Sequence, residues 1–174
     1  MAVIVTAPNP VLRQMAKPVD KIDKKVLSVI ADMRSALISA RNPEGVGLAA
    51  PQIGVPLRIF FARPDLKKQP LLFINPEILK YSQRLQTPDT KHGVYEGCLS
   101  VPHHYSPIQR SMSVTVSYQT VEMINKTDIF TGFLAHIVQH EVDHLNGILF
   151  IDHVLTQKSK LYHIQGKEWE EISL

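Results

Sequence analysis

The segment 139–144, which reads QHEVDH, constrains the fold of this chain more than any other part of the sequence. Within it, His140 and His144 are four residues apart, and Glu141 follows the first histidine. An α-helix turns by about 100° per residue, so residues four apart share a helical face and both imidazoles can bind one divalent cation. The pattern His-Glu-x-x-His is typical of metal-dependent hydrolases, in which the glutamate carries a proton. The sequence therefore predicts a helix here, with a metal site on one of its faces.

Apolar residues at helical spacing predict two helices, over about 20–40 and about 131–145. Asp20 or Asp23 can cap the first, Asp128 or Thr131 can cap the second, and Gly147 is expected just after the second ends. Short strands rich in aliphatic and aromatic residues are expected over 57–62, 71–75 and 111–118. The expected loops are an apolar one over 45–54 and a polar one, or an edge hairpin, over 81–92. Together these elements predict a single α+β domain spanning residues 1–174.

Composition narrows the class of protein. A chain of 174 residues that is 44% hydrophobic and 20% charged fits one soluble domain with its own core. The net charge of +3 is spread along the chain, so direct nucleic-acid binding is not expected. No apolar run approaches the roughly 20 residues that span a bilayer, and no signal-peptide pattern is present. The single cysteine, Cys98, rules out an intramolecular disulfide and suits a reducing cytoplasm.

A catalytic metal site needs a third protein ligand and one open position. In the extended pattern H-E-x-x-H-x-x-G-x-x-H, that ligand would come six residues after His144, where this chain has Phe150. His136 precedes His140 by one turn, but eight residues separate it from His144. Eight helical residues rise by about 12 Å, which one ion with bonds of about 2 Å cannot bridge. His136 is therefore expected to line the approach to the site or to lie on the surface.

Two kinds of third ligand remain. A carboxylate near the C-terminus, from Glu168, Glu170 or Glu171, would make the chain a metallopeptidase. The alternative is Cys98 in the segment EGCLS, because a bound cation would keep the thiol in its coordinating thiolate form. One thiolate and two neutral imidazoles would leave a divalent metal with a net charge of about +1, enough to polarise water toward hydroxide. A third hypothesis is a relative that binds metal without catalysing a reaction.

Three segments resemble, in order, the signature motifs of the peptide deformylase family. They are Gly45-Val46-Gly47-Leu48-Ala49-Ala50-Pro51-Gln52, Glu96-Gly97-Cys98-Leu99-Ser100 and Gln139-His140-Glu141-Val142-Asp143-His144. The resemblance runs from about residue 8 to residue 151. It implies an α+β fold in which the metal-binding helix packs against small antiparallel β-sheets. It also implies hydrolytic removal of the formyl group from the N-terminal formylmethionine of newly synthesised proteins.

The same resemblance implies roles for individual residues. Cys98, His140 and His144 correspond to the ligands of one divalent metal ion per chain, usually Fe2+, with Zn2+, Ni2+ or Co2+ also used. Glu141 corresponds to the general acid/base that takes a proton from metal-bound water and returns it to the departing amine. The Gln52 amide and the Leu99 backbone N–H correspond to donors for the developing oxyanion. The implied substrate-binding residues are Gly45, Val46, Gly47, Val94, Gly97, Tyr105, Phe133, His136 and Ile137.

The implied partners are N-formylmethionyl peptides of nascent chains, met near the ribosome, in a bacterial cytoplasm or an organellar matrix. The expected oligomeric state is a monomer or a weak homodimer. Three regions depart from the family pattern. The hairpin 120–126 lacks the turn that is common in relatives, and His103-His104 follows Pro102 where many members have other residues. The tail after Val154 is short, and residues 158–174 do not resemble the long C-terminal helix of some members. None of these regions contains an implied ligand or Glu141, so the departures concern the family subclass and the rim of the substrate site rather than the chemistry.

Overall fold

The computed structural model describes residues 2–41, 43–86, 95–166 and 168–172. The helices are α1 (Lys24–Ser39), α2 (Gly132–Leu145) and α3 (Phe150–Gln157), with 3-10 turns η1 (Pro10–Arg13) and η2 (Ala50–Ile53). The strands are β1 (Gly47–Ala49), β2 (Ile59–Ala62), β3 (Leu71–Tyr81), β4 (Leu85–Gln86), β5 (Glu96–Cys98), β6 (Val101–Ser106), β7 (Arg110–Ser111), β8 (Ser113–Gln119), β9 (Asn125–Thr131), β10 (Leu161–Gln165) and β11 (Glu168–Ile172). Within these ranges, no helix is both long enough and apolar enough to cross a membrane.

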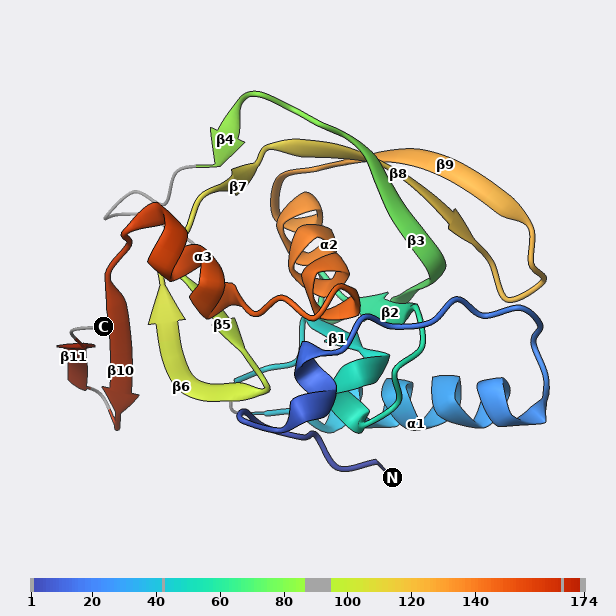
Figure 1. Ribbon diagram of the computed structural model, residues 1–174, viewed down its shortest axis with the longest axis horizontal. Helices are drawn as coiled ribbons and strands as arrows, with labels where there is room; N and C mark the ends of the chain where they lie inside the picture. Colours follow the sequence, from blue (N-terminus) through green and yellow to red (C-terminus); the bar gives the residue numbers. More distant parts are fainter. Residues whose placement is uncertain (1, 42, 87–94, 167, 173–174) are drawn as a thin grey trace.

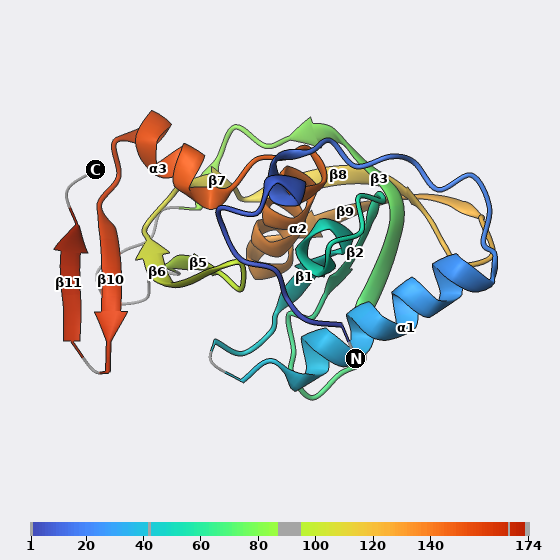
Figure 2. The same ribbon diagram turned by 60° about the horizontal axis from the view of Figure 1, so that its bottom comes forward.

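The strands form three antiparallel sheets around α2. A five-stranded sheet has the order β1-β2-β3-β8-β9, and a four-stranded sheet has the order β11-β10-β6-β5. The short strands β4 and β7 form a pair of their own. Helix α2 lies near the middle of the molecule, α1 lies along its lower edge, and the four-stranded sheet lies at the left (Figures 1 and 2). The expected α+β fold with a central metal-binding helix is confirmed.

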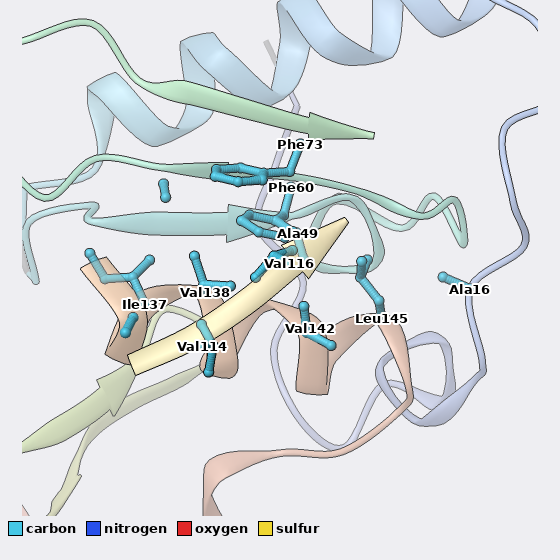
Figure 3. Close-up of a cluster of buried hydrophobic side chains, with 12 residues drawn as sticks. Ala16, Ala49, Phe60, Phe73, Val114, Val116, Ile137, Val138, Val142 and Leu145 are labelled. Carbon is cyan, nitrogen blue, oxygen red and sulfur yellow. The ribbon is translucent and has the colours of Figure 1, made fainter. Parts of the chain in front are cut away.

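Alternation along β2 explains how the five-stranded sheet is covered on both faces. Phe60 and Ala62 pack with the apolar side chains of α2, and Phe60 stacks on Phe73 with ring centroids 4.4 Å apart (Figure 3). Ile59 and Phe61, one residue out of phase, pack with α1. Successive residues of a strand point to opposite faces, so a continuous apolar run such as this one belongs to a strand buried on both sides. The core thereby holds α2 rigidly against the sheet.

The ends of α1 and α2 follow local sequence signals. The Asp23 carboxylate accepts hydrogen bonds from the backbone N–H groups of Lys25 and Val26, at 2.9 and 3.0 Å, and so caps α1. Thr131 occupies the N-cap position of α2, but its side chain makes no capping hydrogen bond. Gly147 follows the end of α2 with φ of 73°, where a Cβ atom would lie 2.6 Å from the carbonyl oxygen of Arg13. Glycine is needed there both for the backbone conformation and for the close approach.

Two segments differ from the sequence-based expectations. Residues 45–54, expected as a loop, contain β1 and the η2 turn, because this apolar segment pairs with β2 as an edge strand. Strand β3 continues past Pro76 to Tyr81, although proline cannot donate a ladder hydrogen bond. The register shifts between Ile74 and Glu77, so Pro76 lies in a bulge, where a proline is tolerated. Of the polar segment 81–92, residues 87–92 lie outside the described ranges.

The tail folds as α3 followed by the β10–β11 hairpin. Phe150 and Val154 of α3 pack with Cys98, Ile108 and Leu161, and together they form a small core under the four-stranded sheet. Strand β10 pairs with β6, so the hairpin widens the sheet whose inner edge carries Cys98. The absence of a long terminal helix agrees with the sequence-based expectation for the described part of 158–174.

Candidate active site

Helix α2 and strand β5 bring one thiol and two imidazoles together. Cys98 Sγ lies 3.2 Å from Nε2 of His144, and the rings of His140 and His144 are 4.8 Å apart between centroids. One ligand atom from each of the three residues lies within 4.8 Å of the others, and all three residues are buried. The two histidines come from one face of α2, as the spacing predicts, whereas Cys98 comes from a strand about 40 residues earlier.

The donor set fits a single divalent metal. Around a tetrahedral ion with bonds of about 2.0–2.3 Å to nitrogen and sulfur, neighbouring ligand atoms lie about 3–4 Å apart, close to the observed sulfur–nitrogen distance. Burial lowers the pKa of His144 well below its ordinary value, so its imidazole is neutral, which is the form that binds metals. The Oε2 atom of Glu141 is also buried beside the cluster without a hydrogen-bond partner among the described residues. These features indicate a site prepared for a cation and a polar ligand.

Glu96 orients the first histidine of the motif. Its Oε1 atom accepts a hydrogen bond from Nδ1 of His140 at 2.6 Å, which fixes the ring and leaves Nε2 for the ligand cluster. Burial alone would lower the pKa of His140, but the neighbouring Glu96 carboxylate raises it well above its ordinary value. The proton that this imidazole carries leaves when Nε2 binds a metal, because the ligand form is neutral, and the Glu96 carboxylate then makes the imidazole a more basic ligand. Glu96 thus supports the site without contacting the metal position.

Glu96 is itself held by a buried network that links β5, β7, α2 and α3. The Arg110 guanidinium donates to both Glu96 oxygens, at 3.0 and 2.7 Å, and to Asp143 Oδ2 at 2.5 Å. Burial alone would raise the pKa of Glu96, but Arg110 and His140 hold it well below its usual range. His136 Nε2 lies 2.6 Å from the second Glu96 oxygen, and His153 Nε2 lies 2.8 Å from Asp143 Oδ2. The carboxylate is therefore charged and fully engaged.

The motif spacing by itself does not predict this role of Glu96. One signal in the sequence points to it, because Glu96 and Cys98 are two residues apart in a strand and so face the same side. The partners of Glu96 come from residues 110, 136 and 140, so only the folded chain identifies them. The same holds for Ser100, whose backbone N–H lies 3.4 Å from Cys98 Sγ and helps to stabilise a thiolate.

We predict that Glu96→Gln weakens metal binding by about 10- to 100-fold, the usual cost of losing a group that orients a ligand. The amide keeps the volume but loses the charge that pairs with Arg110 and raises the basicity of His140. Competition with a chelator of known affinity measures the change. Glu122→Gln, on an exposed turn, serves as the matched control. Equal metal affinity for Glu96→Gln and the unaltered protein would contradict the assigned role.

Glu141 lies against β1 at the inner end of the pocket. Burial raises its pKa to about 8, so near neutral pH the carboxyl can both accept and release a proton. A Cβ atom added to Gly47 would collide with the Glu141 carboxylate, so only glycine leaves room for it. The first signature segment is therefore glycine-rich at this point for a steric reason. The backbone of β1 and the acidic side chain of α2 share one narrow space.

Gln52, in η2, contacts Cys98 at the end of strand β5. Its Oε1 atom accepts the Ala49 backbone N–H at 2.8 Å, which orients Nε2 toward Cys98 Sγ at 3.6 Å and Ser100 Oγ at 3.2 Å. The side chain is 1% exposed, so its amide N–H groups are directed at the ligand cluster rather than at solvent. Leu99 follows Cys98 and borders the same pocket. Both predicted oxyanion donors are thus near the thiol.

A pocket opens between β1, β5 and α2. It is lined by Val46, Gly47, Gly97, Tyr105, Phe133, His136 and Ile137 among the predicted substrate-binding residues, and by Gln52, Cys98, Leu99, His140 and Glu141. Gly45 lies outside this lining, because its backbone packs against Leu37 of α1. Val94 lies outside the described residues. His136 is 5% exposed, so of its two expected positions it takes the one that lines the approach.

The alternative carboxylate ligands lie elsewhere. Glu168, Glu170 and Glu171 are exposed on β11, at the far edge of the four-stranded sheet from β5. Within the described ranges, the His, Cys, Asp and Glu side chains that could share a metal are Cys98, His140 and His144. The arrangement gives no support to a metallopeptidase whose third ligand is a C-terminal glutamate.

Fold and site together define a class of protein, the hydrolases that hold one metal ion on a His-Glu-x-x-His helix. A family model described as polypeptide deformylase matches residues 1–160. The peptide deformylase of Agrobacterium fabrum is 44% identical over 154 residues, 87% of this chain and 85% of that protein. The chain therefore belongs to the polypeptide deformylase family, and it is an enzyme of the hydrolase class.

Solved structures agree with this assignment. The peptide deformylase from Thermotoga maritima is 37% identical and superposes with a TM-score of 0.78, covering 88% of this chain and 97% of that one. A class I type b peptide deformylase from Acinetobacter baumannii, in a Met-Ala-Ser-bound structure, is 33% identical with a TM-score of 0.76. That alignment covers 88% of this chain and 99% of the other.

Proposed function

We propose that this chain hydrolyses the formamide bond of N-terminal formylmethionine on newly synthesised proteins, using Cys98, His140 and His144 to hold one divalent metal ion. The observation that carries this proposal is the convergence of the three ligand atoms and the Glu141 carboxyl at the inner end of a mostly apolar pocket. Family membership supports the reaction, and the geometry supports the assignment of its residues. The products are formate and a free amino terminus.

Each polar group has a separate task in this reaction. When bound, the cation would serve as a Lewis acid that acidifies water and stabilises negative charge on the formyl oxygen. Glu141 accepts the proton of the attacking water and delivers it to the nitrogen of the departing amine, and its raised pKa suits both transfers. Gln52 Nε2 and the Leu99 backbone N–H donate hydrogen bonds to the developing oxyanion, each worth on the order of a hundredfold in rate.

The apolar part of the pocket takes the methionine side chain. Val46, Phe133 and Ile137 line it, and Ile137 is 2% exposed, so its position is fixed by the core behind it. Gly47 and Gly97 let a peptide backbone approach the β1 and β5 edges closely. The Met-Ala-Ser peptide bound to the Acinetobacter baumannii relative supports a methionyl peptide as the ligand of this pocket.

We also propose Fe2+ as the metal in the cell, with Zn2+, Ni2+ or Co2+ as substitutes that the same donors accept. A thiolate and two imidazoles bind any of these ions, and iron is the usual choice in the family that the motifs resemble. The chain works as one catalytic domain of residues 1–174. It acts as a monomer or weak homodimer on nascent chains near the ribosome, in a bacterial cytoplasm or an organellar matrix.

The test of the proposal is formate release from formyl-Met-Ala-Ser by protein prepared without air, with metal analysis of the same sample. We expect one divalent metal per chain, stoichiometric formate, and no cleavage of unblocked Met-Ala-Ser. Metal-loaded protein that releases no formate would refute the function. Metal-loaded protein that cuts unblocked peptides would instead favour a peptidase.

A further inference from the structure

Four aromatic side chains form a continuous surface beside the active-site pocket. They are Tyr95, Tyr105, Tyr162 and Trp169, here called the aromatic face. Trp169 lies at its centre, with its ring centroid 5.2 Å from that of Tyr95, 5.6 Å from Tyr105 and 6.0 Å from Tyr162. Tyr95 and Tyr162 also meet edge to face at 5.8 Å. Aromatic pairs at these distances are mutually attractive, so each ring holds the others in place.

The register of the four-stranded sheet places these rings on one side. Gly97 of β5 is opposite Tyr105 of β6, and Tyr105 is opposite Tyr162 of β10. On the last strand, Trp169 is opposite Ile164, which is two residues from Tyr162 and so shares its face. A Cβ atom on Gly97 would lie 2.5 Å from the Tyr105 ring, so that ring lies directly over the glycine.

The aromatic face is continuous with the substrate pocket. Tyr95 and Tyr105 line the pocket, together with Gly97 and Cys98. Trp169 contacts both tyrosine rings but comes from the hairpin, which lies side by side with β6 on its outer edge (Figures 1 and 2). A peptide that leaves the pocket toward the hairpin therefore passes over a surface of rings.

Trp169 is exposed more than a purely structural role needs. It contacts three rings and yet remains 50% exposed. A large aromatic side chain that is held in place by its neighbours and open to solvent loses little conformational entropy on binding a ligand. Such residues are the usual anchors of peptide recognition.

The β10–β11 hairpin lies beyond the residues that the family model matches. The family model ends at residue 160, and strands β10 and β11 begin at Leu161 and Glu168. The superpositions on the Thermotoga maritima and Acinetobacter baumannii structures each cover 88% of this chain. A function of Trp169 is therefore argued from the contacts that its ring makes in this chain.

We propose that the aromatic face is a subsite for the nascent peptide beyond its methionine, and that Trp169 makes the enzyme favour an aromatic or large apolar side chain there. This inference rests on the proposed function, because the formylated peptide is the ligand that reaches the pocket. The ring centroid of Trp169 lies 5.2 and 5.6 Å from those of Tyr95 and Tyr105, the two tyrosines that line the pocket. An extended chain rises by about 3.3 Å per residue, so the subsite receives the second or third residue of the peptide.

Paired substrates test the proposal, namely formyl-Met-Ala-Phe and formyl-Met-Ala-Ser, with formyl-Met-Phe-Ser to resolve the position. For Trp169→Ala we expect kcat/KM for the better phenylalanine substrate to fall by about two- to tenfold, the size of one aromatic contact. The loss should lie in KM, because the contact is equally strong in the ground state and the transition state. Trp169→Phe should restore most of the preference, and formyl-Met-Ala-Ser should be unaffected.

Two controls separate recognition from folding. Glu170→Ala alters the neighbouring exposed residue, which is opposite His163 and faces the other side of the sheet, so it should leave every substrate unchanged. Trp169 is also the only tryptophan of the chain, so its fluorescence reports on this surface directly. Titration with the product Met-Ala-Phe, or with Met-Phe-Ser if that position is preferred, should change the emission at saturation more than Met-Ala-Ser does.

The proposal would be overturned by an unchanged substrate ratio in Trp169→Ala together with emission that does not respond to the phenylalanine peptides. A fall in kcat that is equal for all substrates would assign Trp169 a structural role and would also overturn it. Failure of the proposed function looks different, because no formate would then appear from any peptide. The fluorescence titration would still decide whether the aromatic face binds peptides.

Discussion

Replacing Glu141 with glutamine is expected to lower kcat by about 10²- to 10⁴-fold while the metal stays bound, because the amide can neither accept nor return a proton. Glutamine has nearly the same volume as glutamate. Burial already raises the pKa of Glu141 to about 8, so the neutral side chain is tolerated in the same space beside Gly47. Formate release and metal content should be measured on the same preparation, and product peptide should still bind.

The control for Glu141→Gln is Asp143→Asn, two residues further along α2. Asp143 contacts Arg110 and His153 rather than the pocket, so its amide should reduce turnover far less. Comparable turnover by Glu141→Gln and the unaltered protein, with full metal occupancy, would remove Glu141 from the mechanism. Loss of metal from the glutamine variant would instead make Glu141 part of the ligand environment.

The second large effect concerns Cys98. We expect Cys98→Ala to lose metal affinity by more than about a hundredfold, since it removes a ligand and losing only a supporting group costs 10- to 100-fold. Cys98 belongs to the same buried cluster as Phe150 and Val154, so the smaller alanine leaves a cavity in that cluster. Only the two imidazoles of α2 then remain as ligands. Chelator competition measures the affinity, and circular dichroism establishes that the helix content is kept.

Ser100→Ala is the matched control for Cys98→Ala. Ser100 is buried next to Gln52 and its hydroxyl is close to the same cluster, but it supplies no ligand. Its alanine variant should bind the metal nearly as well as the unaltered protein. Tight, stoichiometric metal binding by Cys98→Ala would show that another group completes the site and would reopen the question of a carboxylate ligand.

The features that the sequence predicted are those that depend on residues close to one another along the chain. The spacing of His140 and His144 needs only the period of a helix, so it was predictable. An aspartate cap for α1 was also predictable from neighbouring residues, but only the structure selects Asp23 over Asp20. Strand β3 was expected to stop before Pro76, because the bulge that accommodates the proline depends on its pairing with β8. Neighbouring residues alone do not predict where a strand ends when its pairing with a distant strand determines that end.

The sequence by itself determined the helix with two imidazoles on one face, the thiol as a candidate ligand, and the family, because motifs and periodicity are properties of short segments. Only the tertiary structure decided that the Glu96 carboxylate orients His140 and that the Arg110 guanidinium balances the charge of Glu96. It also decided that Gly47 leaves room for the Glu141 carboxylate. It also placed Trp169 against tyrosines more than sixty residues away in the chain. Contacts between distant segments follow from how sheets and helices pack, and the spacing of residues along the chain does not encode them directly.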